Sequence, residues 1–175
     1  LSGIEPSKVS TPTVGMNAAY RLWQEIGWYP TYYVCLDAQL VQTHAQFIFD
    51  ASREGLFRGM FLHQRARNLV SDGAASDILF LDEVRSFLPT LPVRSHPAFI
   101  TRNKLAVTTG SWSIRYAHFL GATEISLAGF DLRYKEKRGA RKLGLTAKEA
   151  DGSGDENYFF KGYQRPGDRY NVANP

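Results

Sequence analysis

Short apolar runs alternate along the sequence with longer segments that have a helical period. The runs are rich in β-branched and aromatic residues, which favour buried strands. Five strands are predicted, at residues 13–17, 31–36, 56–62, 77–81 and 124–130. The last, Glu-Ile-Ser-Leu-Ala-Gly-Phe, has the clearest pattern.

Helices are predicted between these strands, because apolar residues recur there at i, i+3 and i+4. Gly27 and Gly55 have the positions of helix stops, and Asp37 has the position of an N-cap. The predicted helices cover residues 18–26, 38–54 and 108–120. Residues 64–76 are hard to place, and the three prolines of residues 85–97 predict an irregular connection.

This alternation predicts an α/β, Rossmann-like fold with a mostly parallel sheet and helices on both faces. The 175 residues fit a single domain. We expect residues 1–131 to form the nucleotide-binding domain. Residues 132–156 would form a basic flexible lid loop, and residues 157–175 an aromatic and basic C-terminal segment of the same domain.

Composition and charge exclude some classes of protein and favour one kind of ligand. With 43% hydrophobic and 22% charged residues, the chain is not intrinsically disordered, and its single Cys35 excludes an internal disulfide framework. The net charge of +4 is concentrated in residues 132–148, where seven Lys and Arg stand against one Glu. The rest of the chain is slightly acidic, which favours a small anionic ligand over nucleic acid.

Polar residues follow three of the predicted strands. They are Asn17, Asp37 and Asp131. Parallel sheets bind ligands beyond the carboxyl ends of their strands, so these residues are candidates for a binding site. Turn and cap roles are the alternative for each of them.

The segment Thr108-Thr-Gly-Ser-Trp112 opens a predicted helix. Free N–H groups and hydroxyls at a helix N-terminus suit a phosphate, although Thr and Ser also cap helices without any ligand. The segment has neither the P-loop nor the dinucleotide-binding pattern. The four histidines lack metal-ligand spacing, so we expect no metal and no cofactor.

The tail also carries candidate chemistry. Five aromatic residues between 157 and 170 are interleaved with Lys161, Arg165 and Arg169. Exposed aromatic residues at this density usually cover a site or a partner surface. The basic residues 133–142 would neutralise an anion or, alternatively, form a solvated loop.

Four motifs occur in an order that resembles a known family. They are Val14-Gly-Met-Asn17, Pro30-Thr-Tyr-Tyr-Val-Cys-Leu-Asp37, Thr108-Thr-Gly-Ser111 and Ile125-Ser-Leu-Ala-Gly-Phe-Asp131. Over roughly residues 1–135 the chain resembles the bacterial family-42-type sialyltransferases and the related 6-hydroxymethylpterin diphosphokinase-like domain family. The resemblance implies a Rossmann-like fold and a CMP-sugar donor bound without metal. It also implies a sheet without the first strand of that family, because the Gly-Asn-Gly-Pro-Ser motif has no counterpart here.

The resemblance assigns roles by position. It implies donor-nucleotide contacts for Asn17, Asp37, Thr108, Thr109, Gly110, Gly129 and Asp131, with Asp37 standing where the sialyltransferases have Asn. Arg133 and Tyr134 stand at the position of the Tyr that holds the leaving phosphate. No histidine follows His118, so the catalytic His of that family has no counterpart, and Asp155, Tyr158 and Tyr163 are positional candidates for the base.

The leading functional hypothesis is a glycosyltransferase that moves a sialic-acid-like sugar from a CMP-sugar to a glycan acceptor. We expect it in bacterial polysaccharide biosynthesis, in the cytoplasm, with the inner face of the membrane as a surface for peripheral association. Two alternatives stay open. One is a pterin diphosphokinase-like enzyme that uses Mg²⁺ and ATP, and the other is a non-catalytic nucleotide- or glycan-binding domain of a polysaccharide-assembly protein.

Overall fold

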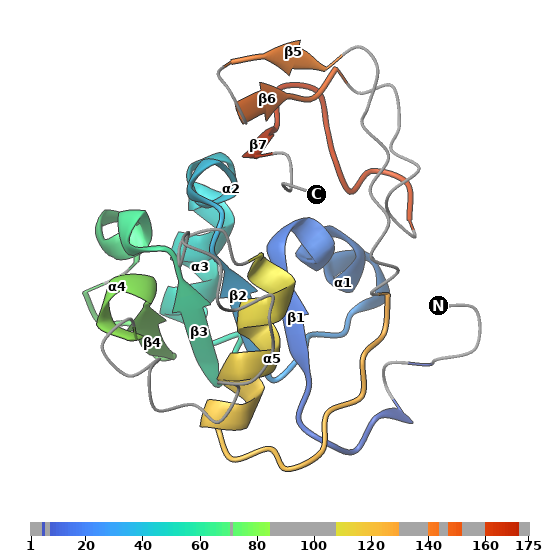
Figure 1. Cartoon of the computed structure of the whole chain (residues 1–175), viewed down its shortest axis with the longest axis vertical. Coiled ribbons are helices and arrows are strands. Elements are labelled where there is room, and N and C mark those ends of the chain that lie inside the picture. The colour runs from blue at the N-terminus through green and yellow to red at the C-terminus, as the bar shows by residue number, and fades with distance from the viewer. Residues whose placement is uncertain are drawn as a thin grey trace, which may run out of the picture.

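A four-stranded parallel sheet is the centre of the fold (Figure 1). The computed structural model describes residues 5, 8–70, 72–84, 108–129, 140–143, 147–151 and 160–171. The sheet has the order β1-β2-β3-β4 and consists of β1 (Val14–Met16), β2 (Tyr32–Cys35), β3 (Gly59–Leu62) and β4 (Asp77–Phe80). The fold is therefore α/β with a parallel sheet, and the four strands confirm the first four predicted from the sequence.

Helices connect and cover these strands. The 3-10 helices are η2 (Asn17–Ala19) and η3 (Gln64–Leu69), and the α-helices are α1 (Tyr20–Ile26), α2 (Ala38–Thr43), α3 (Ala45–Glu54), α4 (Leu81–Val84) and α5 (Thr109–Phe119). Gly27 and Gly55 end α1 and α3 in the left-handed conformation, and Asp37 caps α2, as predicted. The long helix predicted over residues 38–54 is divided at His44 into α2 and α3.

Each face of the parallel sheet buries its own row of side chains. Gly15, Tyr33, Met60 and Ile78 are aligned across the four strands and face α1, α3 and the C-terminal residues. The next row consists of Met16, Val34, Phe61 and Leu79, and it faces Trp112 and Tyr116 of α5. Helices therefore cover both faces, as the alternating pattern predicted.

Gly15 permits a close approach between β1 and α1. A Cβ atom at this position would lie 2.2 Å from two ring atoms of Trp23 and 2.7 Å from Pro30. Trp23 is buried and packs edge-to-face against Tyr33 and Phe57. The missing side chain of Gly15 thus provides the space for the indole ring.

A small antiparallel sheet joins the C-terminal half of the chain to the body. It consists of β5 (Arg141–Lys142), β6 (Ala147–Glu149) and β7 (Arg169–Asn171). Strand β7 lies next to α2, where the hydroxyl of Thr43 donates to the carbonyl of Arg169 and accepts from its N–H. Figure 1 shows the sheet beyond the end of the parallel sheet at which α2 begins.

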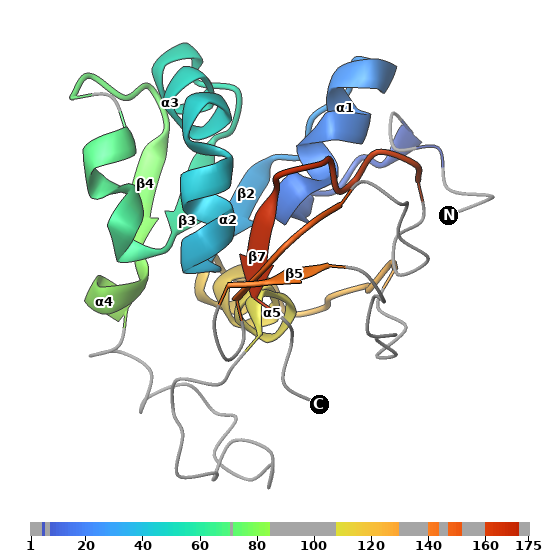
Figure 2. The same ribbon diagram turned by 90° about the horizontal axis from the view of Figure 1, so that it is seen from above.

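The strand predicted over residues 124–130 is wrong for residues 124–129, which are irregular. They lie on the β1 side of the parallel sheet (Figures 1 and 2), and most of them are exposed, including Leu127. An apolar run forms a strand only where a neighbouring strand supplies hydrogen bonds and side-chain contacts, and no described strand pairs with this one. Among the described helices, none is long and apolar enough to cross a membrane.

Candidate functional site

The carboxyl ends of the parallel strands and the start of α5 lie at the same end of the molecule. Asn17, Asp37 and His63 follow β1, β2 and β3 along the chain. Helix α5 runs antiparallel to the strands, because Tyr116 near its end packs on Tyr32 at the start of β2, whereas Trp112 packs on Phe61 late in β3. The first turn of α5 therefore points toward the carboxyl edge of the sheet, where such folds bind ligands.

Asn17 has an unusual backbone conformation at this edge. Its φ of 53° is the only positive φ of a non-glycine residue in the described ranges. The Tyr33 hydroxyl donates to its carbonyl oxygen at 2.9 Å and helps to hold this conformation. The side-chain Oδ1 is buried and has no hydrogen-bond partner among the described residues. A left-handed non-glycine residue with an unpaired acceptor is a candidate ligand-binding position.

Tyr163 lies beside Asn17. It is buried, and the Asn17 side chain and the Ala18 backbone interact with its hydroxyl. Burial raises the pKa of Tyr163 well above its usual range, although these two neighbours act in the opposite direction. A phenol that keeps its proton can position a neighbouring amide, but it is a poor general base at neutral pH.

Asp37 uses both carboxylate oxygens inside the protein. Oδ1 accepts from the N–H groups of Gln39 at 2.7 Å and Leu40 at 3.3 Å, which is the N-cap of α2. Asn171 donates its side-chain amide to Oδ1 at 2.7 Å and its backbone N–H to Oδ2 at 2.8 Å. These contacts make Asp37 a cap and a link to β7.

Thr108, Thr109 and Gly110 form the start of α5. The Thr108 hydroxyl accepts from the Ser111 N–H at 3.3 Å and lies 3.0 Å from the Ser111 hydroxyl, so Thr108 is the N-cap. The first N–H groups of a helix have no partner within the helix, and the helix dipole is positive there. An 11-residue helix that starts at the carboxyl edge is suited to contact a phosphate.

Other predicted site residues lie elsewhere or outside the description. Gly129 is exposed, in a left-handed conformation, and no contact described for it joins it to Asn17 or Thr108. Outside the described residues lie Asp131, Arg133, Tyr134, Asp155 and Tyr158. Of the residues that the resemblance singles out, the structure brings Asn17 and Tyr163 together and places Asp37 and Thr108–Gly110 at the same edge.

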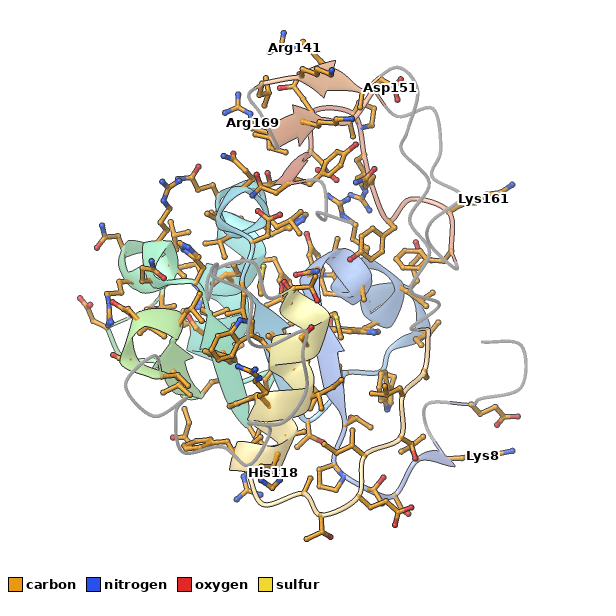
Figure 3. All side chains as sticks on the ribbon, in the orientation of Figure 1. Lys8, His118, Arg141, Asp151, Lys161 and Arg169 are labelled. Atoms are coloured by element: carbon orange, nitrogen blue, oxygen red, sulfur yellow. The ribbon has the colours of Figure 1, made fainter. Side chains whose placement is uncertain are left out.

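Three exposed basic side chains of the C-terminal half point away from this edge, whereas Lys148 of β6 is buried. Figure 3 shows Arg141, Lys161 and Arg169 directed outward. Arg141 and Arg169 each come within 3.6 Å of Glu149, which partly neutralises them. Arg141 and Arg169 therefore lie on an outer surface of the small sheet, and Lys161 lies before β7, outside this sheet.

His63, His118 and Cys35 have structural positions. His63 accepts from the N–H of Arg65 and caps η3. His118 lies at the end of α5 far from the carboxyl edge (Figure 3). Burial raises the pKa of Cys35 to about 12, so its thiol is inert. Within the described ranges no three His, Cys, Asp or Glu side chains are grouped as metal ligands.

A buried polar cluster next to the edge has no counterpart in the sequence prediction. Arg21 of α1 forms a two-pronged ion pair with Asp168, with 3.0 Å between Nη2 and Oδ1, and also donates to the Tyr163 carbonyl at 2.6 Å. The Tyr20 hydroxyl and His44 Nδ1 lie 3.1 Å apart. The sequence indicates this ion pair only weakly. Arg21 stands among apolar residues at the start of α1, and its partner Asp168 is 147 residues away.

No known family, curated protein or solved structure matches this chain. The relation to the sialyltransferases and to the pterin diphosphokinase-like family therefore stays a prediction from the motifs. The structure itself establishes the α/β fold and the polar residues at the carboxyl edge of its parallel sheet.

Proposed function

We propose that the chain binds a CMP-sugar at the carboxyl edge of its parallel sheet and is the donor-binding domain of a glycosyltransferase for sialic-acid-like sugars. The observation that carries this proposal is Asn17, because it combines a left-handed backbone with a buried amide oxygen that has no described partner. The resemblance independently assigns the donor nucleotide to this residue.

The chemistry of Asn17 fits a nucleoside. Tyr33 holds its carbonyl, and Tyr163 lies against its amide group, so Oδ1 is left as a positioned acceptor. The exocyclic amino group of cytosine is a donor that such an oxygen can accept from, whereas uracil has a carbonyl at the same place. Asn17 would therefore distinguish CMP from UMP.

The start of α5 would hold the phosphate. Helix N-termini bind anions through backbone N–H groups, with help from the helix dipole. Thr109 and Gly110 are half-buried at this end of α5, and Gly110 adds no side chain that would keep a phosphate from the backbone. The same groups would stabilise the charge that develops on CMP as the sugar departs.

A non-catalytic nucleotide-binding domain is the second candidate, and two observations favour it. Asp37 is engaged by four N–H donors, and Tyr163 keeps its proton at neutral pH. Tyr163, a positional candidate for the base, is therefore not in a state suited to that role, and the Asp37 carboxylate is not free to replace it. This alternative has the same donor site and differs only in turnover.

The test measures binding and turnover separately. Calorimetric titration of the 175-residue chain with CMP, UMP and AMP should show a preference for CMP that N17A reduces at least tenfold. N68A is the matched control, since Asn68 is exposed on η3. Absence of CMP binding would exclude the proposal, and binding of ATP that requires Mg²⁺ would favour the hypothesis of a diphosphokinase-like enzyme.

Release of CMP from CMP-sialic acid, with and without a glycan, then separates the two candidates. Turnover supports the transferase. Tight CMP binding without turnover supports the binding domain.

A further inference from the structure

Residues 160–171, here named the strap, are tied to the body by side-chain and backbone contacts. Asp168 pairs with Arg21 of α1, the Arg169 backbone is hydrogen-bonded in both directions to Thr43, and Asn171 is bonded to Asp37. Figure 2 shows the strap passing from the α1 side of the molecule to α2, over the carboxyl edge. The strap thus forms one wall of the proposed site.

The strap contributes side chains to the core but makes its backbone hydrogen bonds outside the parallel sheet. Tyr163 and Tyr170 are buried in the cluster that also contains Tyr33 and Met60 of the parallel sheet. Its backbone is bonded to itself and to β6, where Ala150 donates to the Asp168 carbonyl and Gly167 donates to the Ala150 carbonyl. The strap can therefore leave the parallel sheet without breaking any hydrogen bond between β1, β2, β3 and β4.

Three of the titratable groups at the contact are nearly enclosed. Arg21, His44 and Asp168 are each less than 10% exposed. His44 follows Thr43, which is bonded to the strap, and its Nε2 is buried without a partner in the described part of the chain. A proton added at Nε2 would create a second cation next to Arg21, with Asp168 as the nearest anion.

We propose that the strap is an acid-sensitive latch, that is, a segment that covers the carboxyl edge at neutral pH and leaves it at acidic pH. The Arg21–Asp168 ion pair holds the strap in place, and protonation of His44 releases it. At neutral pH the latch is closed and the wall of the site is complete. Acidification protonates His44, the strap leaves the body, and the edge opens.

The electrostatic surroundings of His44 determine whether acid favours the closed or the open strap. It faces Tyr20 and Arg21 from α1 and Arg165 and Asp168 from the strap. Burial, followed by the charge of Arg21, lowers the pKa of His44 to about 4 from its ordinary 6.5. The open state therefore takes up the proton first, and the closed state loses stability as the pH falls from 6.5 toward 4.

Linkage gives the direction of the effect. The ratio of closed to open strap falls as the pH decreases below about 6.5, because the more exposed imidazole of the open state binds the proton more tightly. Asp168 adds nothing in this range. Burial, the largest single cause, would raise the pKa of Asp168, but Arg21, the Arg165 N–H and His44 together hold it below the usual value, so the carboxylate stays ionised until lower pH.

Hydrogen exchange of the intact chain, followed by mass spectrometry from pH 7.5 to 4.5 and corrected for intrinsic rates, tests the latch. We expect the amides of residues 163–171 to lose protection below pH 6.5 while the amides of β2 and β3 keep theirs. H44Q keeps a hydrogen-bonding group near Tyr20 and should remove the pH dependence of the strap. H118Q is the matched control, since His118 is exposed, and it should behave as the parent chain.

A second variant tests whether the Arg21–Asp168 ion pair holds the strap in place. D168N should expose the strap already at pH 7, with β3 still protected. Equal protection of the strap down to pH 4.5 in the parent chain would overturn the proposal, as would an unchanged pH dependence in H44Q. Joint loss of protection by the strap and β3 in D168N would also overturn it, because the strap would then unfold only with the whole domain.

Discussion

Replacement of Gly15 by Ala tests whether the packing between β1 and α1 is as close as the structure shows. The added Cβ would lie 2.2 Å from the Trp23 ring and 2.7 Å from Pro30, both far inside normal contact distance. Trp23 cannot move away cheaply, because the rings of Trp28, Tyr33 and Phe57 surround it at centroid distances of 6.2 to 6.4 Å. Overpacking of a core costs about 1–3 kcal/mol, and contact with two rigid groups places this substitution near about 3 kcal/mol.

The assay is urea unfolding followed by circular dichroism and tryptophan fluorescence. For a loss of about 3 kcal/mol and an m-value of roughly 2 kcal/mol/M, the midpoint should fall by about 1.5 M. G73A is the matched control, because a Cβ at Gly73 meets no heavy atom within 4 Å. We expect its midpoint to change by less than about 0.5 M.

A second substitution tests the cause of the loss. Trp23→Leu shortens the side chain that the new methyl group meets, so the double variant G15A/W23L should be more stable than the sum of the two single losses predicts. Additive losses in the double variant, or equal midpoints for G15A and G73A, would refute the packing argument.

Four further substitutions test the carboxyl edge and its surroundings. Arg21→Ala or Asp168→Ala alone should cost about 3–5 kcal/mol in urea unfolding, because each leaves a buried charge without a partner, and the double variant should cost less than their sum. Asp37→Ala removes the cap of α2 and the link to β7, and should lower the midpoint by an amount equivalent to about 1–2 kcal/mol; a neutral result would contradict the capping role. Tyr163→Phe keeps the ring buried but removes the hydroxyl beside Asn17, so CMP affinity should fall about five- to tenfold with little change in the unfolding midpoint; unchanged affinity would show that Tyr163 does not position the amide.

Local patterns predicted the parts of the fold that local forces determine. The four parallel strands have the β-branched and aromatic residues of buried strands, and Gly27, Gly55 and Asp37 have their predicted capping roles. The same reasoning failed for residues 124–129, because strand formation depends on a pairing partner that the sequence of the segment does not contain.

The site was only partly predictable for the same reason. Asn17 could be placed at the end of β1 from the pattern, but its left-handed backbone depends on the Tyr33 hydroxyl across the strand pair. The Arg21–Asp168 pair was not predictable, since nothing near either residue indicates the other. The break at His44, whose Nδ1 lies 3.1 Å from the Tyr20 hydroxyl, is not revealed by a helical period.

The ion pair between Arg21 and Asp168 also makes an early part of the chain depend on a late one during synthesis. At roughly 5–20 residues per second, the 147 residues between them take on the order of ten seconds to translate. During that interval α1 carries a cation that the finished protein buries, and burying it without the carboxylate would cost several kcal/mol. Arg21 can therefore be buried at its final place only when residue 168 has left the ribosome. A chain that stopped short of this residue would leave Arg21 without its carboxylate and would be a better substrate for chaperones and proteases.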